Sequence, residues 1–338
     1  MGIYQLLKKM NMKNYIKNLV IVIILCAVQQ SFAQQDPLYT QYYNNFSLIN
    51  PAYSGSHGVF TATANIRSQW AGEAGGPETQ TLSLHGQTGK NVGLGLSIVN
   101  DKVYVLNETH VFADFSYSIA PSENSTLAFG LKAGGSFLNV DLLELGIEND
   151  NLFSENINQF NPNIGAGAFY YTDKFYLSLS TVNILKTKRY AKNSNVVSSA
   201  SDEMVFYFSS GYVFDLSDAF KLRPSVMFRA VNGSPLSTDI STSILWNDKL
   251  EFGISHRIDE SISGLFQIRL SDNLKIGYTY DAITSELSNY NSGSHEFSVI
   301  LNLGGSEANK SKRKPPFYWM KGKNSEEIQK MDVEKKIE

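Results

Sequence analysis

The sequence has one cysteine and no long apolar run beyond its first thirty residues. Cys26 is the only cysteine among 338 residues. The remainder of the chain therefore lacks the thiols that disulfides, thiolate metal sites and cysteine nucleophiles require. After residue 33 no stretch approaches the roughly 20 apolar residues of a membrane-spanning helix. A chain of this kind enters a membrane only as a closed β-barrel, because helices and barrels alone satisfy the backbone in lipid.

The first 33 residues have the pattern of a secretory signal peptide. A basic stretch without acidic residues precedes the ten-residue apolar core Leu19–Val28, and Ser31-Phe32-Ala33 supplies small residues for cleavage before Gln34. Met12 is an alternative start. Lipidation of Cys26 is the weaker alternative, because Ile23-Ile24-Leu25 lacks the small residue normally found beside a lipidated cysteine.

The charge is unevenly distributed. Residues 304–338 carry nine basic and six acidic residues, whereas Gln34–Leu303 carries 16 basic and 26 acidic residues. An acidic body argues against nucleic acid as a partner.

Catalytic and metal motifs are sparse. The five histidines stand alone in sequence, with no spaced metal pair, at His57, His85, His110, His256 and His295. His110 and Asp114 share a strand face at i, i+4, which we interpret as luminal polarity. Nucleophile elbows, phosphate-binding glycine loops and zinc spacings are lacking. We expect no enzyme activity, no cofactor and no metal; a hydrolase at the barrel rim remains a remote alternative.

Period-two alternation dominates from His57 onward. In Asn273–Asp281, for example, Leu274 and Ile276 share one face while Lys275 and Asp281 share the other. Such alternation predicts strands with an apolar face toward lipid and a polar face toward the lumen. A soluble sandwich also alternates, so the pattern alone does not decide.

Fourteen strands are expected. Their predicted ranges are 57–69, 78–87, 91–100, 104–120, 124–140, 162–172, 174–183, 203–215, 219–231, 235–247, 249–258, 261–271, 273–283 and 293–303. Even-numbered strands precede tight turns such as Asn247-Asp248, whereas most odd-numbered strands precede long polar loops such as Leu142–Asn161 and Ile184–Ser201. Short turns on one rim and long loops on the other are typical of outer-membrane barrels. An even strand number places both termini on the periplasmic side.

The predicted organisation therefore has four parts. Residues 1–33 are the signal peptide, 34–56 an irregular segment with room to enter the lumen as a plug, 57–303 a transmembrane antiparallel β-barrel, and 304–338 a periplasmic tail. The glycines within strands, such as Gly93, Gly130 and Gly167, indicate strand curvature and close packing against such a plug.

Two groups of side chains are expected near the outer rim. Arg67 and Gln69 lie opposite Ile66 and should point into the lumen, where Arg67 is expected to bind an acidic plug rather than to line a pore. Aromatic residues near strand ends are expected to form interfacial girdles, at Trp70, Tyr104, Tyr170, Tyr171, Tyr190 and Trp246.

The two longest loops have opposite charge. The first contains Glu144, Glu148, Asp150 and Glu155, and the second contains Lys186, Lys188, Arg189 and Lys192. Such a pair suits docking of a folded domain by charge complementarity, although ordinary solvated loops explain it almost as well.

Several motifs resemble one family. The runs QQDPLYTQYYNN at 34–45, NPAYSG at 50–55 and RSQWAG at 67–72, with GYTYDAITSELSNYNSGSHEFSV at 277–299, resemble the PorP/SprF family of outer-membrane proteins of type IX secretion and gliding motility. On this chain the markers are Asn50, Pro51, Tyr53, Gly55, Arg67, Gln69 and Trp70. The resemblance covers residues 34–303.

The resemblance implies a non-enzymatic barrel that binds a secreted surface protein, often a large adhesin, through its C-terminal sorting domain. Its role would be export or surface anchoring of that protein. The tail Gly304–Glu338 would meet periplasmic components of the secretion machinery. A transport or diffusion barrel for small molecules or lipids is the alternative.

Overall fold

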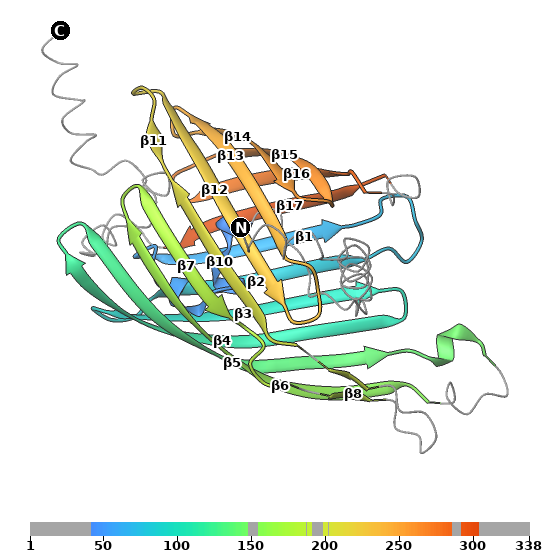
Figure 1. The fold of residues 1–338 in the computed structure, drawn as a ribbon. Coiled ribbons are helices and arrows are strands. Elements are labelled where there is room, and N and C mark those ends of the chain that lie inside the picture. The colour runs from blue at the N-terminus through green and yellow to red at the C-terminus, as the bar shows by residue number, and fades with distance from the viewer. Residues whose placement is uncertain are drawn as a thin grey trace, which may run out of the picture. The chain divides into compact units, whose positions relative to one another are not determined.

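The computed structural model describes residues 42–147, 155–186, 188–190, 199–201, 203–285 and 292–303. Within this part of the chain no helix is both long and apolar enough to cross a bilayer. The structure consists of antiparallel strands, which circle a segment of short 3-10 turns (Figure 1).

The strands form one closed barrel. Their order follows the sequence, the first and last strands pair with each other, and β10 pairs with both β7 and β12. The strands are β1 (Phe60–Ser68), β2 (Glu78–Gln87), β3 (Val92–Val103), β4 (Leu106–Ser122), β5 (Ser125–Val140), β6 (Ile157–Thr172), β7 (Phe175–Thr181), β10 (Val205–Tyr212) with its continuation β11 (Phe214–Asp215), β12 (Phe220–Val231), β13 (Ser237–Trp246), β14 (Leu250–Arg257), β15 (Ser261–Arg269), β16 (Leu274–Ile283) and β17 (Ser294–Leu303). Counting β10 and β11 as one strand interrupted at Val213, the barrel has the predicted fourteen strands.

A separate small hairpin lies within the second long loop. β8 (Lys188–Tyr190) pairs with β9 (Ser199–Ser201), which the sequence did not predict. The barrel and the described segment before it belong to one compact unit, from which only the turn Gly233–Pro235 is separate.

The two faces of the wall have opposite polarity, as predicted. Large apolar side chains point outward, with Leu131 63% and Ile254 64% exposed. Polar side chains point inward and are buried, among them Glu251, Glu296 and Thr279. An apolar outer band around a polar interior is what a lipid-embedded barrel requires.

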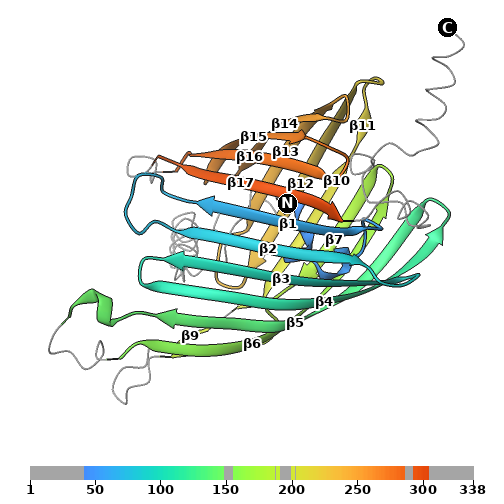
Figure 2. The ribbon, with the colours of Figure 1, turned by 180° about the vertical axis from the view of Figure 1, so that it is seen from behind.

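The largest correction to the predicted strand ends concerns β6. β6 begins at Ile157 rather than at residue 162, because Ile157–Asn161 pairs with Ser136–Val140 of β5. Strands β4, β5 and β6 therefore have 16 or 17 residues, whereas β7 has seven. The wall thus rises further on the β4–β6 side than at β7, as both views show (Figures 1 and 2).

The aromatic residues at strand ends divide between lipid and lumen. Trp70, Tyr104 and Trp246 are exposed, and Phe220 stacks on Trp246 with ring centroids 6.3 Å apart. Tyr171 was also expected in an interfacial girdle. That prediction is wrong, because the alternation along β6 turns the Tyr171 side chain into the lumen, where it is 2% exposed. The side chain of Tyr190 lies outside the described residues.

Candidate functional site

The NPAYSG motif lies inside the barrel. The segment Tyr42–His57, here called the plug, contains the turns η1 (Tyr42–Asn44), η2 (Phe46–Leu48) and η3 (Pro51–Tyr53). Asn50 caps η3 because its Oδ1 accepts a hydrogen bond from the Ala52 N–H at 2.9 Å, and Pro51 occupies the first position of the turn, where no N–H is needed. The blue segment within the ring of strands in Figure 1 is this plug.

Asn50 fastens the plug to two strands. Its Nδ2 donates to Ser178 Oγ of β7 at 2.8 Å and to the Ala168 carbonyl of β6 at 3.0 Å. The Ser180 hydroxyl donates to the Ile49 carbonyl at 2.7 Å. Asn50 is 0% exposed, so all of its amide atoms must be satisfied inside the protein.

Wall glycines make room for the plug backbone. A Cβ built on Gly130 would collide with the backbone of Pro51 and Ala52, and one built on Gly93 would collide with the Ser54 carbonyl. A Cβ on Gly167 would meet the Asn50 side chain. The strands β3, β5 and β6 therefore form a glycine cradle, defined here as Gly93, Gly95, Gly130 and Gly167.

Glycine also serves within the plug. Gly55 has φ of +81°, a conformation that other residues adopt only with strain. The last position of the NPAYSG motif is therefore glycine because the plug turns there with a positive φ.

An aromatic cluster holds the middle of the plug. The Phe46 ring centroid lies 5.2 Å from that of Tyr176 and 5.7 Å from that of Phe169, and Tyr53 lies 5.3 Å from Phe169. All four side chains are 0% exposed. Aromatic pairs at these distances add about 0.5–1.5 kcal/mol each beyond the burial of their area.

A buried ion pair supports the plug beside this cluster. Lys132 Nζ of β5 lies 2.7 Å from Asp114 Oδ1 of β4 and donates to the Ser47 carbonyl at 3.1 Å. Ser54 Oγ donates to Asp114 Oδ2 at 3.3 Å. Asp114 therefore pairs with a lysine, and the sequence prediction that related it to His110 missed this partner.

A histidine pair lies where the plug meets β1 and β2. Tyr53 OH lies 2.7 Å from His57 Nε2, and His57 Nδ1 lies 2.9 Å from Thr61 Oγ1. The Gly55 N–H donates to His85 Nδ1 at 3.3 Å, and the two imidazole centroids are 5.0 Å apart. Burial, followed by the charges of His85 and Lys275, lowers the pKa of His57 well below 6.5.

Arg67 is bonded to two carboxylates of the barrel wall. Its Nη1 lies 2.5 Å from Asp281 Oδ2 of β16 and 3.0 Å from Glu296 Oε2 of β17, and Asn65 donates to Glu296 at 2.8 Å. The expected acidic plug is not found among the described residues, because Tyr42–His57 contains no acidic side chain. Asp36, the one acidic residue of the predicted plug, lies outside the described residues. Neighbouring strands supply the carboxylates, and pairing across β1, β17 and β16 brings them within reach.

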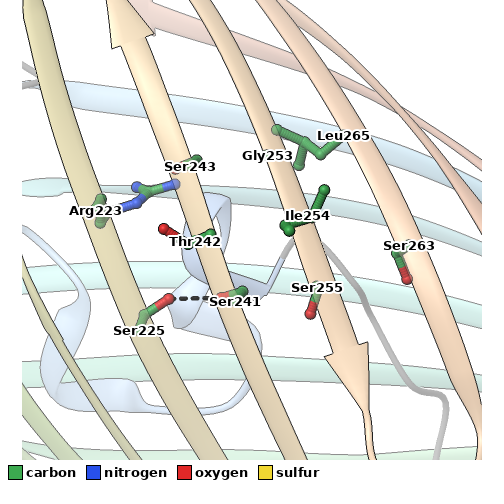
Figure 3. A pocket seen from close by; sticks show the side chains of 10 residues that line it. All are labelled: Arg223, Ser225, Ser241, Thr242, Ser243, Gly253, Ile254, Ser255, Ser263 and Leu265. Carbon is green, nitrogen blue, oxygen red and sulfur yellow. Dashed lines mark hydrogen bonds between the residues drawn. The ribbon is translucent and has the colours of Figure 1, made fainter.

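The opposite wall carries further pairs and a cavity. Arg223 of β12 bonds Glu251 of β14 at 2.6 Å, and Arg257 bonds Asp239 and Glu260, each at 2.9 Å. Beside Arg223, five serines line a cavity with room for about one water molecule (Figure 3), namely Ser225, Ser241, Ser243, Ser255 and Ser263.

The remaining marker residues lie at the rim. The Gln69 N–H donates to the Pro77 carbonyl at 2.8 Å, beyond the end of β1, and Gln69 is only partly buried. Trp70 has φ of +54° and is 41% exposed. Neither residue joins the cluster around Asn50, Tyr53 and Gly55.

Only part of the two charged loops is described. Glu144 is exposed in the turn η4 (Leu143–Leu145), and Lys186 pairs with Glu203 at 3.0 Å in its own loop. Glu148 and Asp150 lie outside the described residues, as do the side chains of Lys188 and Arg189. In the described portion of the two loops, no acidic side chain of the β5–β6 loop contacts a basic side chain of the β7–β10 loop.

The two histidines of the hydrolase alternative lack a serine–acid arrangement in the described residues. His110 lies 3.9 Å from Glu108 and stacks near Phe112. His256 is exposed on the outer face of β14. No group of three metal-binding side chains is found in the portion of the chain that the structure describes.

Comparison with known proteins gives one family. The model of the family described as type IX secretion system membrane protein PorP/SprF matches residues 31–301. No curated protein matches the sequence. The sequence motifs at 34–45, 50–55 and 67–72 all lie within the matched range.

Solved barrels resemble the chain only in fold. The CymD monoaromatic hydrocarbon channel is 11% identical, with a TM-score of 0.47 over 79% of this chain and 94% of that chain. Omp33 of Acinetobacter baumannii is 8% identical, with a TM-score of 0.45 over 72% and 98%. A FadL homologue of Pseudomonas aeruginosa is 12% identical, with a TM-score of 0.42 over 75% and 93%.

Proposed function

Because the chain belongs to the PorP/SprF family of type IX secretion system membrane proteins, we propose that it holds a secreted partner at the outer rim of its barrel. The partner is a surface protein, such as a large adhesin, bound through its C-terminal sorting domain. Holding it supports its export, anchors it at the surface, or both, and gliding motility is the process it would serve.

The observation that carries the proposal is the filled lumen. The plug crosses the barrel interior, and the charged side chains behind it are paired and buried, with Glu296 0% and Arg257 2% exposed. A barrel filled in this way offers its rim, rather than an aqueous channel, to other molecules. The alternative of a diffusion barrel requires a lumen open to water, and a lipid transporter with a lateral opening requires an apolar one.

The rim offers a raised side. Strands β4–β6 extend past β7, and the loop between β5 and β6 exposes Leu143 and Ile147 next to Glu144. Exposed apolar side chains beside a charge are the composition of an interaction surface with a polar edge. We place the partner on this side, with the long loops facing outward from the cell and both termini in the periplasm.

The tail is proposed to serve the other side of the membrane. Residues 304–338 have a net positive charge and follow β17, which ends at the rim of tight turns. We propose that this tail meets periplasmic components of the secretion or gliding machinery.

The test is recovery of the partner with the barrel. The full chain, tagged at its C-terminus, is purified gently from its native outer membrane, and co-purifying proteins are identified. We expect a large surface protein that is lost when the loop residues 142–156, which precede β6, are exchanged for a neutral loop of equal length. The matched control exchanges the turn Asn247-Asp248 on the opposite rim and should keep the partner.

Two results would contradict the proposal. One is a barrel that comes out alone from membranes in which the surface protein is present. The other is equal recovery of that protein with the two exchanged variants, since the rim would then not be the binding surface. A barrel that comes out alone and conducts ions at neutral pH would instead favour the transport alternative.

A further inference from the structure

The plug is fastened mainly to one half of the barrel. Its hydrogen bonds described above end on β1, β2 and β4–β7, and its close approaches on the glycine cradle of β3, β5 and β6. Tyr42 is the exception, since it reaches Ser225 and Ser241 across the lumen. A segment anchored along one wall can leave that wall without breaking the strand pairing that closes the barrel.

The inner face of the opposite wall is polar. Serines on β12–β15 surround a small cavity, and Ser243 Oγ is buried without a partner among the described residues (Figure 3). Long charged side chains such as Arg229 and Glu251 are buried on the same inner face. The cations there lie against carboxylates, as in Arg223–Glu251 and Arg257–Asp239. With the plug displaced, this wall would line a polar passage, which suits small hydrophilic solutes.

One contact of the plug requires a neutral imidazole. His85 Nδ1 accepts the Gly55 N–H, so the proton of neutral His85 must be on Nε2. A second proton would place an N–H on Nδ1, facing the N–H of Gly55, and the bond would be lost. His57 differs, because Thr61 donates to Asn302 and accepts from His57 Nδ1, while the Tyr53 hydroxyl can either donate to His57 Nε2 or accept from it. Protonation of His57 therefore keeps both bonds and acts by placing a charge among buried groups.

The surroundings oppose a charge on either ring. The titratable and charged groups that face the pair are Tyr53 from the plug, Lys275 from β16, and, beside Ser54, Asp114 from β4 with its partner Lys132 from β5. Asp114 is already paired with Lys132, and no carboxylate contacts either imidazole in the described portion of the chain. Two protonated rings 5.0 Å apart would also repel each other.

We propose that the plug is a stopper released by acid. Protonation of His85 breaks its bond to Gly55, and a charge on His57 beside it adds repulsion. The plug is then displaced, which opens a passage for small hydrophilic solutes along the β12–β15 wall. This activity goes beyond partner binding and is a property of the barrel alone.

The direction of the effect follows from linkage. In the seated plug the histidine is held neutral, whereas in the released plug it can take up a proton. Proton uptake favours the released state, so the seated state becomes less stable as the pH falls below about 6.5. Each such histidine changes the ratio of released to seated plug by about tenfold per pH unit in that range. Between pH 6.5 and 4.5 we therefore expect a change of up to about fiftyfold for each histidine.

The experiment measures conductance and solute entry in the purified full chain. The barrel is placed in planar bilayers, and in liposomes with glycerol as the probe, at pH 7.5 and 4.5. We expect closed barrels at pH 7.5 and reversible opening at pH 4.5. The double variant His57→Gln and His85→Gln should lose the pH dependence, whereas the control His256→Gln, on the outer face, should keep it.

A covalent lock provides a second measurement. An ideal Cβ at Gly95 would lie 2.6 Å from Ser54 Oγ, so Ser54→Cys with Gly95→Cys can join plug and wall by a disulfide. The oxidised variant should stay closed at pH 4.5 and open after reduction. Acid opening that persists in the oxidised lock or in the double histidine variant would overturn the proposal, and so would equal conductance of the unaltered barrel at the two pH values.

Discussion

Adding one methyl group to the glycine cradle should displace the plug. In Gly130→Ala the new Cβ would overlap the Ala52 N and Cα and the Pro51 carbonyl carbon, which are backbone atoms and have no rotamer to change. Overpacking of this kind costs about 1–3 kcal/mol. The shift also stretches the hydrogen bonds of Asn50, worth about 0.5–1.5 kcal/mol each. We therefore expect a weakening of plug seating by about 2–4 kcal/mol.

Amide hydrogen exchange measures this weakening directly. The Ala52 and Tyr53 N–H groups bond to Asn50 within the plug, and both residues are buried, at 1% and 0% exposure, so these amides reach water only when the plug leaves the wall. In Gly130→Ala their exchange should accelerate about 30- to 1000-fold, since 1.4 kcal/mol corresponds to tenfold. Gly264→Ala is the matched control, because nothing lies within 4 Å of its Cβ position. Equal exchange of the plug amides in the two variants would refute the reasoning.

Two further predictions concern the wall. Arg67→Met leaves Asp281 and Glu296 buried without their cation and should destabilise the barrel by about 3–5 kcal/mol, measured as a lower urea midpoint in detergent. Adding Asp281→Asn and Glu296→Gln should recover much of that loss, and no recovery would show that the charges are not its cause. Ile254→Arg, on the lipid face, should cost about 2–4 kcal/mol of insertion and lower the folded fraction in liposomes, with a smaller loss for Ile258→Arg nearer the rim. Equal losses for the two would contradict the lipid-facing assignment.

Sequence reasoning succeeded where a strand is specified by its own alternation. Strand β2 was predicted at 78–87 and has those bounds, because Leu82 and Leu84 alternate with Thr81 and Ser83 without interruption. The start of β6 was missed because Ile157–Asn161 is rich in amide side chains and has little β character of its own. The start of β6 is determined instead by the pairing of Ile157–Asn161 with β5, which includes a contact between the Phe137 and Phe160 rings at 4.8 Å.

The interior was predictable only in kind. Glycines within strands indicated close packing in the lumen, and the structure places Gly93, Gly130 and Gly167 against the NPAYSG motif. The partners of charged residues were not predictable, since Lys132 and Asp114 are brought together by strand register rather than by spacing in sequence. For Arg67 the sequence indicated the inward direction but not which carboxylates it would meet.

The position of the plug has a consequence for the order of assembly. The hydrogen bonds from Ile49, Asn50 and His57 join the plug to β1, β6 and β7, which end no later than Thr181, so these contacts lie in the first part of the barrel to be synthesised. Contacts close in sequence form sooner than distant ones. The N-terminal strands can therefore acquire their filling before β12–β17 arrive, and the seam between β1 and β17 then closes around a completed interior. The plug then acts as a template around which the barrel closes, in addition to filling the closed barrel.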